Sequence, residues 1–218
     1  MVNRGDDFIL DRERMVKEQI AGRGIDDTAV LEAMRTIPRE LFVPERYWEH
    51  AYDDTPLPIP GKQTISQPYV VALMISHLAL DAEDCVLEIG TGSGYAAALL
   101  SQMVREVHTV ERIKELVDYA CQRLDFLGID NVTIHHGDGT LGWPEAAPYD
   151  GIVVAAGGPI VPESLKYQLA EQGRLIIPVG PNERRQQLIS VTKTAEDGFQ
   201  QSELGMVAFV PLIGDEGW

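Results

Sequence analysis

The sequence predicts one α/β domain: a doubly wound, mostly parallel sheet with helices before it and a pair of β-strands after it. Three observations support this fold. Short apolar runs alternate with helical patterns from residue 68 onward, and parallel strands need helical crossovers between them. A glycine-rich segment follows the first of these apolar runs, as in sheets that bind ligands at strand ends. A length of 218 residues suits one large domain better than two ordinary ones.

The first part of the chain is predicted to be helical. An apolar stripe beginning near Met15 predicts helices within residues 11–48. Asp26 or Asp27 is placed to cap a second helix, and Pro38 is placed to end it.

A proline-rich segment separates these helices from the alternating part. Residues 51–67 contain Pro56, Pro58, Pro60 and Gly61. We expect a loop without regular structure there, and loops of that length tend to be lids or binding loops.

The alternating part supplies the sheet. Pro68 suits the first position of a helix, and the apolar runs after it are typical of buried strands. Strands are expected at 85–89, 107–110, 132–135, 151–155 and 174–178, helices at 94–103, 113–127 and 162–169, and a final β pair at 188–192 and 206–210, joined through the polar stretch 193–203.

The charge of the chain excludes some functions. Lys and Arg number 18 against 34 Asp and Glu, a formal net charge of −16. Such a chain is repelled by phosphate backbones and anionic membranes. Its start lacks the apolar core of a signal peptide, and no uncharged apolar stretch approaches the roughly 20 residues that span a bilayer. We therefore expect a cytoplasmic protein with no nucleic-acid or membrane partner.

The cysteines and histidines carry no catalytic or metal-binding pattern. Cys85 and Cys121 lack disulfide or metal-ligand spacing, so each is expected to be a small core side chain. His108 and His135 are expected to be surface or hydrogen-bonded residues. We expect no metal site.

The glycine-rich segment is the most informative motif. Val86-Leu-Glu-Ile-Gly-Thr-Gly-Ser-Gly-Tyr95 leaves the first strand and opens a helix. A dinucleotide fingerprint, G-x-G-x-x-G, would need its third glycine at position 95, which is Tyr. Glu88 would be an awkward neighbour for a pyrophosphate but suits a cationic ligand. The motif favours S-adenosylmethionine, and a dinucleotide or no cofactor stay as alternatives.

Two further carboxylates strengthen the case for S-adenosylmethionine. Glu111 ends the second strand, 21 residues after Gly90, where an acidic residue can accept hydrogen bonds from ribose hydroxyls. Asp138 follows the third strand, where it can accept from an adenine amino group. The predicted cofactor residues are Glu88, Gly90, Thr91, Gly92, Ser93, Gly94, Glu111, Asp138 and Gly139.

Motifs along almost the whole chain resemble the protein-L-isoaspartate O-methyltransferases. The most specific of them precedes the glycine-rich segment, and one departure is Glu171-Gln-Gly173, where the family often has paired glycines. The matching motifs are Thr64-Ile-Ser-Gln-Pro68, Val86–Tyr95, Val110-Glu-Arg112, Gly137-Asp-Gly139, Tyr149-Asp-Gly-Ile152, Arg174-Leu-Ile-Ile-Pro-Val-Gly180 and Val210-Pro-Leu-Ile213.

This resemblance implies a Rossmann-like methyltransferase fold and a repair reaction. The methyl group of S-adenosylmethionine would pass to the α-carboxylate of L-isoaspartyl residues in damaged proteins and peptides. The resemblance places Thr64, Ile65, Ser66 and Gln67 at the acceptor site, with Val210, Pro211, Leu212 and Ile213 as the opposite wall.

Ser66 is the predicted catalytic residue. It stands just before Pro68, next to a helix N-terminus, where a hydroxyl and free backbone N–H groups favour an anion. The alternative is that Ser66 only caps its helix.

Within one methyltransferase domain we expect three parts. Residues 1–67 form the helices and substrate loop, 68–180 the cofactor-binding core, and 181–218 the strands that complete the acceptor site. Alternative functions are methyl transfer to a small-molecule oxygen or nitrogen, a nicotinamide-dependent oxidoreductase, and a non-catalytic nucleoside-binding protein.

Overall fold

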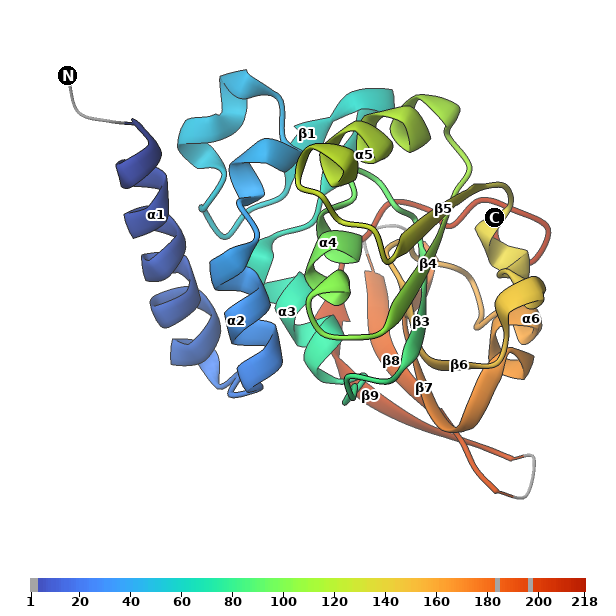
Figure 1. The fold of residues 1–218 in the computed structure, drawn as a ribbon. Helices are drawn as coiled ribbons and strands as arrows, with labels where there is room; N and C mark the ends of the chain where they lie inside the picture. Colours follow the sequence, from blue (N-terminus) through green and yellow to red (C-terminus); the bar gives the residue numbers. More distant parts are fainter. Residues whose placement is uncertain (1–3, 183–184, 196–197) are drawn as a thin grey trace.

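A seven-stranded sheet forms the centre of the molecule (Figure 1). The structure is a computed structural model that describes residues 4–182, 185–195 and 198–218. The strands follow the order β5-β4-β3-β6-β7-β8-β9. The first five in this order are parallel, and β8 and β9 continue the sheet antiparallel at one edge, which confirms the predicted fold. Their bounds are β3 (Cys85–Ile89), β4 (Glu106–Glu111), β5 (Val132–His136), β6 (Tyr149–Val154), β7 (Leu169–Asn182), β8 (Arg185–Lys193) and β9 (Phe199–Val207).

Helices cover the two faces of this sheet unequally. In Figure 1, α1 and α2 lie outermost on one side, and α6 lies on the opposite side. Val86 of β3 belongs to the core beneath α2, α3, α4 and α5, whereas Leu87 and Ile89 pack with Leu165 of α6. None of the described helices combines the length and apolar character needed to cross a bilayer. The helices are α1 (Arg4–Arg14), α2 (Thr28–Thr36), α3 (Pro68–Ser76), α4 (Tyr95–Ser101), α5 (Lys114–Phe126) and α6 (Glu163–Tyr167).

The N-terminal helices follow the predicted signals, except at their start. α1 begins at Arg4, earlier than predicted, and continues into a π-helical turn, Met15–Ile20. The carboxylate of Asp27 accepts a hydrogen bond from Val30 N at 3.1 Å and so caps α2. The predicted start was too late because the apolar residues just before position 11, Phe8, Ile9 and Leu10, are consecutive and so show no helical stripe.

The expectation of an unstructured loop at 51–67 was wrong. This segment contains a two-stranded antiparallel hairpin, β1 (Leu57–Ile59) and β2 (Gln63–Ile65). The turn is possible because Gly61 adopts a φ of 66°, a left-handed conformation that glycine tolerates. Leu57, Ile59 and Ile65 are buried, so the hairpin is attached to the core.

The C-terminal β pair exists, but its second strand was misplaced. β9 spans Phe199–Val207, so it begins inside the predicted polar connection, 193–203, and overlaps the predicted strand, 206–210, only at Met206 and Val207. β9 is one of the two edge strands of the sheet, and most of its side chains are exposed, so it has no apolar run to identify it. The predicted 181–218 part includes residues 183–184 and 196–197, and the 1–67 part includes residues 1–3, which lie outside the described residues.

Candidate functional site

A pocket opens where the carboxyl ends of β3, β4 and β6 meet β2 and residues 209–213. Ligands in open α/β sheets bind outside these strand ends. Three predicted residues, Gln67, Gly94 and Asp138, are not among those lining the pocket. The predicted residues that do line it are Thr64, Ile65, Ser66, Glu88, Gly90, Thr91, Gly92, Ser93, Glu111, Gly139, Val210, Pro211, Leu212 and Ile213.

The glycine-rich turn after β3 is shaped by its backbone. Gly90 has a φ of 92°, a left-handed conformation that is costly for residues with a Cβ. Its N–H donates to Val110 O at 2.9 Å, which ties the turn to β4. Gly94 faces Ala120 of α5, at 3.1 Å from an added Cβ. Gly94 therefore allows α4 and α5 to pack and does not contact the pocket.

Glu88 brings a buried carboxyl group to the pocket. Its exposed fraction is 1%, and Thr109 Oγ1 donates to its Oε2 at 2.6 Å. Burial raises the pKa of Glu88 to about 8; the hydrogen bond from Thr109 lowers this pKa, and the nearby charge of Glu111 raises it. The site thus contains a carboxyl group whose ionised form would be favoured by a cationic ligand beside it.

Glu111 connects the glycine-rich turn to the loop after β4. Its Oε2 accepts from Gly92 N at 3.0 Å, and its Oε1 accepts from Ile113 N at 2.8 Å. The side chain is 5% exposed and lines the pocket. Each carboxylate oxygen has more than one lone pair, so both can still accept hydrogen bonds from a ligand.

Both carboxylate oxygens of Asp138 already accept hydrogen bonds from the protein backbone. Its Oδ1 accepts from Thr140 N at 2.9 Å, and its Oδ2 accepts from Asp215 N at 2.8 Å. Burial raises the pKa of this carboxyl group, but hydrogen bonds from Asp215 and Thr140 outweigh it and hold the pKa below its ordinary value. The C-terminal segment therefore contacts Asp138, which the sequence analysis had placed near adenine. Gly139, the next residue, lines the pocket, and Asp138 does not.

Ser66 lines the pocket, but the helix N-terminus beside it is not free. Pro68 has no N–H, and Tyr69 N donates to Asp54 Oδ1 at 3.1 Å. Gln67 is the N-cap residue of α3 and makes no side-chain cap; its Nε2 donates to Asp54 Oδ2 at 3.3 Å. The expectations of free N–H groups for an anion and of a capping Ser66 were both wrong, because Asp54 caps this helix from the preceding loop.

Arg39 fixes the backbone at Ser66 by a hydrogen bond to its carbonyl. Its side chain is fully buried; Nη2 donates to Ser66 O at 2.7 Å and Nε donates to Ala51 O at 2.8 Å. The guanidinium also lies over the ring of Tyr95, 4.8 Å from its centroid. Burial lowers the pKa of Arg39, and the neighbouring Tyr95 raises it. Arg39 was not predicted from the sequence, because a buried arginine has no sequence pattern that distinguishes it from an exposed one.

The wall formed by residues 210–213 is fixed by its neighbours. Gly157 N donates to Val210 O and Leu212 N donates to Gly157 O, each at 2.8 Å. The buried side chain of Gln186 closes a pair of hydrogen bonds with the backbone of Phe209, at 2.7 and 3.1 Å. This segment is therefore held against the end of the sheet by backbone contacts.

Comparisons with known proteins agree with this arrangement. A family model described as protein-L-isoaspartate(D-aspartate) O-methyltransferase matches residues 10–217. A protein-L-isoaspartate O-methyltransferase of Rhodopseudomonas palustris (strain HaA2) is 57% identical over 211 residues, 97% of this chain and 86% of the relative. A protein-L-isoaspartate O-methyltransferase of Pelobacter propionicus is 58% identical over 207 residues, 95% of this chain and 92% of the relative.

Two solved structures show the same fold along nearly the whole chain. One, of a protein-L-isoaspartate O-methyltransferase, has a TM-score of 0.83 at 33% identity and covers 94% of this chain and 67% of the other. The second is a Plasmodium falciparum protein, described as a beta-aspartate methyltransferase and solved with S-adenosyl-L-homocysteine. It has a TM-score of 0.80 at 30% identity and covers 93% of this chain and 98% of the other.

Proposed function

This chain belongs to the protein-L-isoaspartate(D-aspartate) O-methyltransferase family, and we propose that its donor and acceptor meet in the pocket at the ends of β3, β4 and β6. The enzyme transfers a methyl group from S-adenosylmethionine to the α-carboxylate of L-isoaspartyl residues in damaged proteins, which starts their repair. The main support for this site is that Ser66, the glycine-rich turn and residues 210–213 all line one pocket.

The residues of this pocket suit S-adenosylmethionine. The glycine-rich turn brings bare backbone to the strand end, and the buried carboxyl group of Glu88 lies beside it. We assign Glu88 to the positively charged part of the donor and Glu111 to its ribose hydroxyls. When bound, S-adenosylmethionine supplies a methyl group made electrophilic by a sulfonium.

The acceptor needs no general base in this site. A carboxylic acid with a pKa near about 4 is already ionised at neutral pH. What the protein must supply is close, in-line placement and exclusion of water from the carboxylate. We assign the placement to the hydroxyl of Ser66, which would donate to a carboxylate oxygen, and to Thr64 and Ile65 beside it.

Arg39 supports this assignment by fixing the Ser66 backbone. It donates hydrogen bonds to the carbonyls of Ser66 and Ala51, so both ends of the segment 51–66 are bound to the same buried side chain. The segment 210–213 forms the facing wall, and we propose that it binds the peptide through backbone groups. Recognition of backbone rather than of one side chain would accept many different damaged sequences.

A pair of matched peptides tests the proposed reaction. Peptides that differ only in an isoaspartyl or aspartyl residue are incubated with the enzyme and the donor, and mass spectrometry follows the gain of one methyl group. We expect methylation of the isoaspartyl peptide alone. Equal labelling of both peptides, or of neither, would contradict the proposed acceptor.

The Ser66→Ala variant tests the proposed catalytic residue. We expect it to keep its affinity for S-adenosylhomocysteine in calorimetry while its methylation rate falls at least about tenfold, the change that the loss of roughly one hydrogen bond predicts. Ser76→Ala, at the other end of α3 and outside the pocket lining, is the matched control and should keep its rate. An unchanged rate in Ser66→Ala would remove Ser66 from the reaction.

We also propose a cytoplasmic location and a single domain in three functional parts. Cys85 and Cys121 are both free thiols, as is usual in reducing compartments. Residues 1–67 contribute β2 to the pocket, 68–180 the cofactor core, and 181–218 the facing wall.

A further inference from the structure

Three side chains with metal-binding atoms meet outside the lining of the methyl-transfer pocket. Cys85 begins β3, while Glu106 and His108 stand near the start of β4. In the parallel register Cys85 lies opposite Glu106, and Leu87 opposite His108. Alternate positions of neighbouring strands therefore point to one face, at the amino ends of strands whose carboxyl ends form the pocket.

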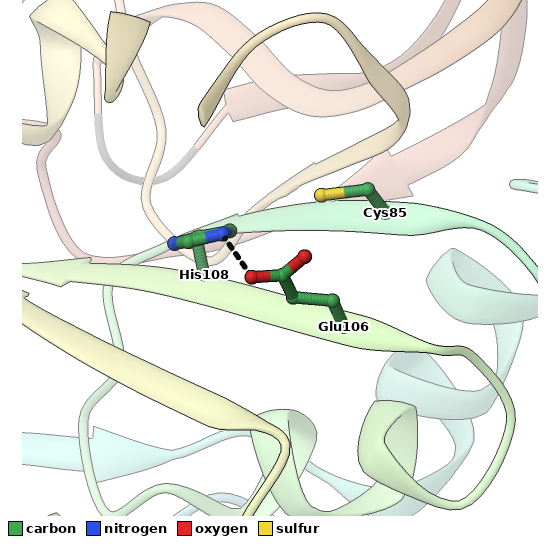
Figure 2. A group of neighbouring side chains, drawn as sticks. All are labelled: Cys85, Glu106 and His108. Carbon is green, nitrogen blue, oxygen red and sulfur yellow. Dashed lines mark hydrogen bonds and ion pairs between the residues drawn. The ribbon is translucent and has the colours of Figure 1, made fainter. Parts of the chain in front are cut away.

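The geometry of this cluster suits a metal ion. One ligand atom from each side chain lies within 4.8 Å of the other two, and the three side chains point toward one another (Figure 2). His108 Nε2 and Glu106 Oε1 are 3.1 Å apart. Ordinary zinc bond lengths give edges of roughly 3.3 to 3.6 Å in a tetrahedral site. The histidine and glutamate are thus almost in place, and the cysteine sulfur must approach by about 1 Å.

A second histidine orients the first. His108 Nδ1 and His135 Nε2 are 3.0 Å apart, and the ring of His135 stacks on Trp143 with centroids 3.8 Å apart. When His135 carries its proton on Nδ1, its Nε2 accepts a hydrogen bond from His108 Nδ1. A proton on His108 Nδ1 then leaves the lone pair of Nε2 for an ion, as in most histidine metal sites.

The electrostatics of the cluster also favour a cation. A thiolate and a carboxylate this close repel each other unless a cation lies between them. The formal net charge of −16 adds a general attraction for cations.

We propose that Cys85, Glu106 and His108 bind one Zn²⁺ ion. A thiolate and an imidazole select zinc over magnesium or calcium, which prefer oxygen ligands. Binding replaces the thiol proton of Cys85 with a sulfur–zinc bond and releases that proton to solvent. The Glu106 side chain is 41% exposed, so a water molecule can complete the tetrahedron. The site departs from the sequence expectation of no metal because its ligands come from two strands.

Cobalt reports on this site directly. Tag-free protein is freed of metal with a chelator and titrated with Co²⁺, which occupies zinc sites and absorbs in the near ultraviolet when bonded to sulfur. We expect this charge-transfer band to saturate at one ion per chain and to disappear when Zn²⁺ is added. Cys85→Ser should abolish the band, whereas Cys121→Ser, the matched control at the other free thiol, should keep it.

Zinc affinity supplies the second measurement. Glu106→Gln changes a half-exposed side chain and should fold normally while binding Zn²⁺ more weakly. His135→Phe should weaken binding about 10- to 100-fold, as loss of an orienting partner does. A titration without the sulfur band, or a band that survives Cys85→Ser, would overturn the proposal. Methylation by Cys85→Ser should be unchanged, so this test is independent of the proposed acceptor site.

Discussion

The Glu88→Gln substitution should change how the stability of the ligand-free enzyme depends on pH. Glu88 is buried beside Thr109, and burial raises its pKa from the ordinary value of 4.5 to about 8. Glutamine has nearly the same shape and can still accept the hydrogen bond from Thr109, but it has no charge to desolvate. The comparison of the two proteins therefore isolates the cost of ionising one buried carboxyl group.

The sign and size of the effect follow from proton linkage. Between pH 4.5 and about 8 the folded wild type keeps the Glu88 proton that the unfolded chain has lost. Stability therefore falls as pH rises through this window, by about 1.4 kcal/mol per pH unit for one proton. From about pH 5.5 to about pH 7.5, the wild type should lose roughly 2 to 3 kcal/mol relative to Glu88→Gln.

Urea denaturation of both proteins at several pH values measures this difference. Other titrating groups contribute equally to both proteins, so they cancel when the two free energies of unfolding are subtracted. Glu83→Gln, at an exposed position, is the matched control, and its stability should follow that of the wild type at every pH.

Parallel stability curves for the wild type and Glu88→Gln would contradict the expected loss of stability. That result would mean that Glu88 is ionised in the folded protein at neutral pH, and that burial does not govern its pKa. The interpretation of this site as one prepared for a cation would then lose its electrostatic support.

Three further predictions concern packing and charge. Arg39→Ala removes the donors to the carbonyls of Ser66 and Ala51 and should lower the free energy of unfolding, measured with urea, by about 3 to 5 kcal/mol. Its control, Arg35→Ala, breaks partly exposed ion pairs and should lower that free energy by at most about 1 kcal/mol. A Cβ at Gly139 would lie 2.5 Å from Ile89 Cγ2, so Gly139→Ala should cost about 1 to 3 kcal/mol, while Gly137→Ala, with no atom within 4 Å, should be nearly neutral. Added salt should leave the KM for acidic isoaspartyl peptides unchanged or lower it. The net charge of −16 repels such peptides, and salt screens charges beyond roughly 8 to 10 Å. A marked rise in KM would contradict this prediction.

The elements with strong local patterns were predicted well. β3 matches its predicted bounds, 85–89, because every residue of this central strand is buried and the sequence is continuously apolar except at Glu88. The segments that were misplaced lack such a signal. β1 and β2 lie in a proline-rich stretch, and β9 is an exposed edge strand, so neither produces a clear apolar run.

The candidate site was predicted where it depends on the backbone at strand ends. Gly90 and Glu111 occupy the places that their spacing indicated. Asp138 and the helix beside Ser66 do not have the free hydrogen-bonding groups that the sequence predicted. Each contacts a residue from another segment of the chain: Asp138 contacts Asp215, and the helix contacts Asp54. Spacing along the chain carries no information about these partners.

The alternation of strands and helices and the glycine-rich turn could be predicted from the chain alone, because each depends on residues close together in the sequence. The cofactor class followed from that turn and from the spacing of acidic residues at successive strand ends. The contact of Arg39 with Ser66 and the proximity of Cys85 to His108 became visible only in the folded protein. The physical reason is that a periodic pattern reports which side of an element is buried. The group that a buried side chain meets depends on how distant elements pack and align.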